Sequence, residues 1–148
     1  MSEYELYHYG VRGMKWGVRR KLRKSTDFQD SKKNVKRSHK KYLETEDVYY
    51  NARKKAEAQF DAKHPYNPNM SKDQHLEWNI DRYVHVLNKS HSSAQNRDRA
   101  KQEYKQLLQN TVDKHRNTLV GDLKITERQR QRIDRIIQDE LVKDLFKD

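Results

Sequence analysis

The sequence contains no cysteine, only two prolines and four glycines, and few apolar residues. Without cysteine, the chain has neither a disulfide framework nor a thiolate metal site. Only 32% of its 148 residues are hydrophobic and 37% are charged, which is too few apolar residues for a large central core. No apolar run approaches the roughly 18 residues that span a bilayer, and the first residues lack the apolar core of a secretory signal. We therefore expect a soluble chain in which either long helices bury a narrow seam, or part of the chain stays disordered until a partner binds.

Recognisable catalytic and metal-binding patterns are also missing. The sequence has no cysteine nucleophile, no phosphate-cradling glycine loop and no paired-histidine zinc signature. No two of its seven histidines are four residues apart, the spacing that places two metal ligands on one helix face. We predict a protein that is not an enzyme and uses neither a cofactor nor a metal.

Positive charge is abundant and lies mostly near the N-terminus. The net charge is +11, and residues 1–41 hold 13 Lys/Arg against 4 Asp/Glu, whereas residues 42–148 hold 20 against 18. A concentrated positive segment attracts polyanions such as nucleic acid, or the acidic surface of a protein. Solubilising charge is the plainer interpretation of the same lysines, and the sequence does not separate the two.

Residues 1–24 are predicted to form a basic N-terminal segment distinct from a helical domain over 25–148. Glycines at positions 10, 13 and 17 make a continuous helix there costly, at about 1 kcal/mol for each internal glycine, so we expect a loop over 7–20. Aromatic anchors and cations alternate in this segment, which suits phosphate contacts and base stacking or protein docking. The candidate binding residues are Tyr7, Tyr9, Arg12, Lys15, Trp16, Arg19, Arg20, Lys21, Arg23 and Lys24.

The first predicted helix covers residues 26–62. Ser25, Thr26 and Asp27 are suitable N-cap residues, and the two prolines at 65 and 68 end the helix. Within it, a bulky line recurs every seven residues beside a line of small residues, which is a heptad register. The bulky line consists of Phe28, Val35, Tyr42, Tyr49 and Ala56.

Two further helices are predicted over residues 72–116 and 126–146. Ser71 with Gln74, and Thr126 with Gln129, have the spacing of capping boxes. The apolar stripe of the second helix thins between residues 89 and 94, so this region is either one helix with a weak point or two helices with a turn. No strand-like alternation occurs, and the fold predicted is all-α, with three or four elongated helices in a hairpin or small bundle.

The first helix needs a partner for its bulky line. It could pack within the chain against residues 76–87 and 133–145, or against a second copy as a homo-oligomer, and the sequence favours neither.

The segment from Leu6 to Arg20 resembles a short motif of tailed-bacteriophage and prophage proteins of Gram-positive bacteria. Its usual form reads His, aromatic, Gly, Val or Ile, basic, Gly-Met-Lys-Trp-Gly-Val-Arg and a final basic residue, at one end of otherwise unrelated chains. Arg12 stands where lysine is commoner, which keeps the charge. The resemblance covers some 15 residues and implies phage origin, with a place in the virion or the host bacterial cytoplasm, but it implies no activity.

Together these features predict a phage structural or assembly-accessory protein. Its basic N-terminal segment would dock on a phage structural protein or on nucleic acid. Two alternatives remain: a phage inhibitor of a host defence nucleoprotein, similar in kind to anti-CRISPR proteins, and a sequence-nonspecific nucleic-acid-binding protein. All three use the same basic segment.

Overall fold

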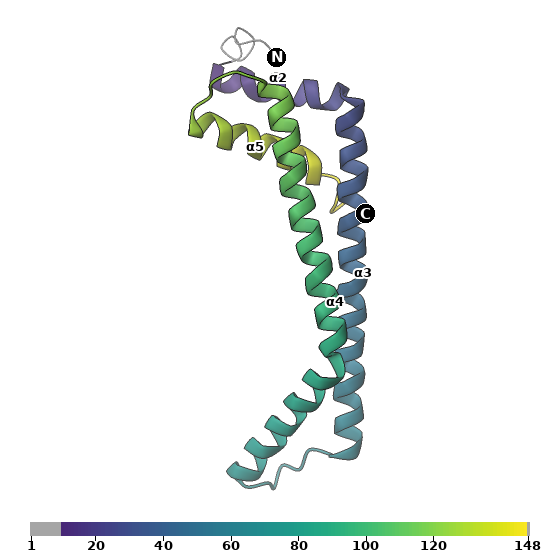
Figure 1. Cartoon of the computed structure of the whole chain (residues 1–148). Coiled ribbons are helices and arrows are strands. Elements are labelled where there is room, and N and C mark those ends of the chain that lie inside the picture. The colour runs from purple at the N-terminus through teal and green to yellow at the C-terminus, as the bar shows by residue number, and fades with distance from the viewer. Residues whose placement is uncertain (1–9, 148) are drawn as a thin grey trace. The chain divides into compact units, whose positions relative to one another are not determined.

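The computed structural model describes the backbone of residues 10–147 and the side chains of residues 17–147. Four helices account for most of this range: α2 (Gly10–Lys24), α3 (Thr26–Lys63), α4 (Lys72–Val120) and α5 (Glu127–Val142) (Figure 1). No strand occurs in the part of the chain that is described. The predicted all-α fold of elongated helices is confirmed.

Helix α2 corrects the prediction of a loop over residues 7–20. Residues 10–24 are α-helical although they include Gly10, Gly13 and Gly17, and residues 7–9 lie outside the described part. Val18 and Leu22, four positions apart, are 1% and 2% exposed and belong to the core. Burial of two such side chains outweighs the glycine penalty of about 1 kcal/mol each, because packing rather than propensity holds most helices in proteins.

Helix α3 begins and ends almost where the sequence predicts. Ser25 caps its first turn, since the Ser25 Oγ accepts a hydrogen bond from the Phe28 amide at 3.2 Å. The helix ends at Lys63, just before His64 and Pro65. Within the bulky line, Phe28, Val35 and Ala56 are fully buried, as the heptad register predicts.

Helix α4 is continuous through residues 89–94, so of the two arrangements considered for this region the structure has a single helix. The Ser71 and Gln74 capping box is present at its start. Ser90 is buried, and its Oγ donates to the Val86 carbonyl at 2.6 Å, a side-chain bond that often bends helices. Figure 1 shows α4 bent in its teal part. The helix runs four residues beyond the predicted end, and Gly121, with a φ of 58°, terminates it.

Helix α5 has the strongest local start signal. Thr126 and Gln129 form a complete capping box. The helix ends at Val142, four residues before the predicted end. Its buried face consists of Ile133, Ile136, Ile137, Glu140 and Leu141.

The chain packs as two units. Unit 1 comprises residues 1–40 and 103–148, and unit 2 comprises residues 41–102. The boundary at 24/25 that the sequence suggested falls inside unit 1, because α2 packs against α5 there. The unit 1 core contains Val18, Leu22, Phe28, Val35, Val112, Leu119, Val120, Ile133, Ile136, Ile137 and Leu141.

Unit 2 is a helical hairpin with a small aromatic centre. Phe60 of α3 is 6% exposed and lies edge-on to Trp78 of α4, with 5.7 Å between the ring centroids. The Trp78 Nε1 donates to the His64 carbonyl at 2.9 Å, which ties the loop to α4. Arg82 of α4 holds Asp61 of α3 through two hydrogen bonds of 2.8 and 3.0 Å. None of the described helices has a stretch long and apolar enough to cross a membrane.

Candidate functional site

Positive charge is concentrated in unit 1. By sequence, unit 1 carries 22 Lys/Arg against 13 Asp/Glu, whereas unit 2 carries 11 against 9. The basic residues of unit 1 come from all four helices and from the segments that follow α4 and α5. Helices α2 and α5 pack directly against each other. A candidate binding surface is therefore sought in this unit.

Helix α2 separates its apolar and basic residues onto two faces. Val18 and Leu22 point into the core, and Arg20, Lys21 and Lys24 are exposed. These three cations retain the accessibility that the sequence-based hypothesis requires. Among the other candidates, Arg12, Lys15 and Trp16 lie on the α2 backbone with side chains outside the described part, and Tyr7 and Tyr9 precede it.

Arg19 and Arg23, also predicted as binding residues, instead face a buried acid. Glu140 of α5 is 3% exposed. The Arg23 Nη2 donates to its Oε1 at 3.1 Å, and the Lys143 Nζ donates to its Oε2 at 2.9 Å. The Arg19 Nε lies 3.5 Å from Oε1, a charge contact without a hydrogen bond. These arginines compensate a buried carboxylate.

Burial alone would raise the pKa of Glu140. Together, the hydrogen bonds from Lys143 and Arg23 outweigh the effect of burial. The pKa of Glu140 therefore lies below its usual value, and the carboxylate stays ionised. No local pattern in the sequence indicates this cluster, because Glu140 lies 117 residues from Arg23.

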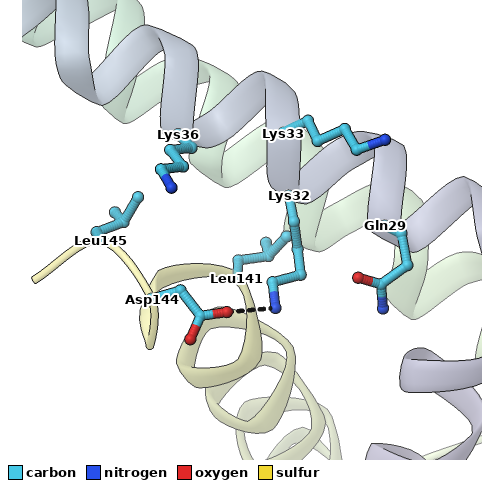
Figure 2. Close-up of a pocket in the computed structure, with 7 residues that line it drawn as sticks. All are labelled: Gln29, Lys32, Lys33, Lys36, Leu141, Asp144 and Leu145. Atoms are coloured by element: carbon cyan, nitrogen blue, oxygen red, sulfur yellow. Dashed lines mark hydrogen bonds and ion pairs between the residues drawn. The ribbon is translucent and has the colours of Figure 1, made fainter. Parts of the chain in front are cut away.

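The basic face of α3 borders a shallow pocket of about 200 Å³. Figure 2 shows lysines of α3 on one side of it and the end of α5 on the other. The Lys32 Nζ donates to the Asp144 Oδ2 at 2.9 Å, and Lys32 and Lys147 hold the pKa of Asp144 well below its usual value. Lys32 is thus committed to an ion pair, whereas Lys36 is exposed at the rim.

Sequence reasoning missed three arginines on α5. Arg128 and Arg135 are exposed and Arg132 is half-buried. No ion pair joins any of the three to another residue of the described part. Their spacing of four and three residues places them on one face, away from Ile133 and Ile137, which are buried. This spacing in the sequence could have revealed the three arginines. They were overlooked because residues 42–148 carry nearly equal numbers of basic and acidic residues.

One buried pair has the geometry of a nucleophile and a base. Ser31 Oγ and His115 Nε2 are 2.8 Å apart. Both residues are nearly inaccessible, at 9% and 3% exposed, and the Phe28 ring meets the imidazole edge-on at 5.0 Å. A pocket of about 240 Å³ reaches His115 but is not lined by Ser31. The pair therefore satisfies polar groups within the core.

Clusters of three or more metal-ligating side chains are absent from the described residues. What the site offers is a set of accessible cations on α2, α3 and α5, held in place by a packed core. Such a set suits contacts with phosphates or carboxylates.

Comparison with known proteins finds one short likeness. Residues 2–22 match the model of a family described as "Family of unknown function (DUF7211)", and residues 10–22 of that stretch form most of α2. No curated protein and no solved structure matches the chain.

Proposed function

We propose that this chain is a non-enzymatic structural or assembly-accessory protein of a phage, which docks on nucleic acid through the exposed cations of unit 1. The observation that carries the proposal is the concentration of charge in unit 1, with 22 Lys/Arg against 13 Asp/Glu. The resemblance of residues 6–20 to phage proteins supports the phage setting.

The arrangement of cations favours phosphate contacts over base readout. Arg20 and Lys24 lie on the exposed face of α2, and Arg128 and Arg135 lie on the exposed face of α5. Cations of this kind neutralise phosphates and release counterions, which gives affinity without sequence preference. Binding is accordingly sequence-nonspecific and strongly dependent on salt.

Salt titration of binding to a random-sequence DNA duplex, followed by fluorescence anisotropy, tests this function. The test variant replaces four exposed cations of unit 1 by glutamine: Arg20, Lys24, Arg128 and Arg135. We expect weaker binding and a shallower slope of log affinity against log salt, by about 0.9 for each phosphate that the variant no longer neutralises.

A matched control removes the same charge from unit 2. It replaces four exposed lysines by glutamine: Lys54, Lys55, Lys89 and Lys101. Equal loss of affinity in both variants would show that net charge alone acts, and salt-insensitive binding would exclude a phosphate interface. Deleting residues 1–24 is a poor test, because it also removes Val18 and Leu22 from the core.

The phage setting has its own test. Mass spectrometry of purified particles and assembly intermediates from a phage that encodes this chain should detect the protein. Its absence from both would rule out the structural and assembly roles, even if the DNA titration succeeds.

A further inference from the structure

An apolar stripe lies on the exposed face of α4 in unit 2. Leu76, Ile80, Tyr83, Val84 and Leu87 are 60%, 52%, 68%, 45% and 49% exposed. Their spacing places them on one side of the helix. In a chain with 32% hydrophobic residues, five large apolar side chains on one solvent-facing stripe indicate an interaction surface.

Helix α3 contacts the other side of α4. Trp78 and His85 both meet Phe60 of α3, each with 5.7 Å between ring centroids. Arg82 is bonded to Asp61 of α3. The first helix was expected to pack either within the chain, in part against residues 76–87, or against a second copy. Its packing within the chain against residues 76–87 does not use this stripe.

The stripe is complementary to itself. Leu76, Ile80, Tyr83 and Leu87 are separated by four, three and four residues, a spacing that reads the same in both directions. An antiparallel second copy, related by a two-fold axis, would set Leu76 against Leu87 and Ile80 against Tyr83. This gives the same patch on both partners, as two-fold interfaces require.

Polar side chains beside the stripe are compatible with the same arrangement. Asp73 and Glu77 flank its beginning, Asn88 and His91 flank its end on the same side, and all four are exposed. The two-fold operation brings Asp73 beside His91 of the other copy and Glu77 beside Asn88. Among these four residues no two like charges meet, although the exposed Asp81 of each copy comes level with Asp81 of the other further round this side. The self-complementary spacing of the stripe is what favours a second copy of this chain as the occupant.

From these observations we infer that the stripe Leu76–Leu87 is a self-association surface that joins two copies through antiparallel α4 segments. Its five side chains supply on the order of 400 Å² of apolar surface per copy. A stable interface usually buries about 800 Å² on each partner. The pair is therefore a reversible dimer whose population depends on concentration.

Sedimentation equilibrium over a wide range of concentration tests the surface. The apparent mass should rise from 18.0 kDa toward twice that value. Ile80→Glu should weaken association by about tenfold or more, whereas the control Val48→Glu, at a 59% exposed site on α3, should leave it unchanged. A monomer at every concentration, or equal effects of the two substitutions, would overturn the inference.

The absence of native cysteine allows a direct test of orientation. Leu76→Cys and Leu87→Cys chains are mixed and oxidised at a concentration where the unsubstituted chain dimerises. The antiparallel pair predicts a disulfide between the two different chains. Two Leu76 positions would lie about 16 Å apart along the helices, beyond the roughly 6 Å between Cα atoms of a disulfide. Disulfides formed preferentially between identical chains would refute the arrangement. It would also be refuted if the chain stayed monomeric and used the stripe to bind another protein.

Discussion

Glu140 and His115 are two buried polar residues whose contacts stabilise the packing of unit 1. Glu140 is held by cations from α2 and by Lys143. The His115 imidazole is buried beside Phe28 and bonded to Ser31. Each is a polar group inside the core that keeps its partner only while the helices stay packed.

Replacing Glu140 with glutamine should lower the free energy of unfolding by about 1–2 kcal/mol, because charge-assisted hydrogen bonds from Arg23 and Lys143 become weaker. Urea denaturation followed by circular dichroism measures the change. Arg20→Gln is the matched control, since Arg20 is exposed. An equal effect of both substitutions would contradict the structural role given to Glu140.

Replacing Ser31 with alanine should cost about 1–3 kcal/mol, because it leaves the buried His115 Nε2 without its hydrogen-bond partner. The same urea assay applies. Ser38→Ala, at a half-buried site on the same helix, is the control, and we expect its effect to be smaller.

Acidification should destabilise the fold in two stages. Burial lowers the pKa of His115 below its ordinary 6.5; the charge of Asp27 opposes this effect and that of Lys114 adds to it. As pH falls, the imidazole is therefore protonated in the unfolded chain before it is protonated in the folded chain. The free energy of unfolding consequently decreases as pH drops below about 6.5. The pKa of Glu140 is also lowered, from 4.5; stability from its ionised form is complete above 4.5 and is lost as pH falls further. Urea midpoints between pH 8 and 3 check this, and a His115→Gln chain should lack the first stage.

At the scale of helices, the sequence predicted those helix ends that interactions between neighbouring residues determine. The capping boxes at Ser71 and Thr126 mark two helix starts correctly, because their hydrogen bonds join residues three apart. The end of α3 was predictable because proline follows. Helix α2 was not, since its glycines oppose a helix locally and its stabilising contacts with α5 come from far along the chain.

The face that a helix buries was equally beyond the sequence. In α4 the most regular apolar stripe, Leu76 to Leu87, is exposed, and the side carrying Trp78 and Arg82 packs on α3. Aromatic rings and a bonded arginine can cover a partner helix as well as aliphatic residues do. The periodicity of the sequence shows that a helix has an apolar face, but it does not show which of its faces is buried.

Replacing Leu22 with alanine tests whether packing holds α2. We expect a loss of about 2–5 kcal/mol and a larger rise in amide exchange for residues 17–24 than for the middle of α3. Hydrogen exchange measured by mass spectrometry separates the two regions. Unchanged exchange in residues 17–24 would mean that α2 is helical independently of its core contacts.

At the scale of the whole chain, the two units differ in core size. Unit 1 buries eleven apolar residues in one cluster, whereas the buried apolar residues of unit 2 are Ala56, Phe60, Val86 and Ala100. Local stability follows the number of buried apolar contacts. In hydrogen exchange at low urea and low protein concentration, residues 41–102 should therefore open before unit 1. A single transition shared by both units would show that α3 and α4 couple them fully.

The contact between α2 and α5 also affects how the protein is made. Unit 2 is continuous in sequence, but the unit 1 core brings Val18 and Leu22 together with residues 133–141. On a ribosome that adds 5–20 residues each second, α2 emerges roughly ten seconds before its partner exists. During that interval Val18 and Leu22 have no core to enter, and a glycine-rich, basic segment stands open to chaperones and polyanions. Synthesis thus delays completion of the unit 1 core until after all of residues 41–102 have been made.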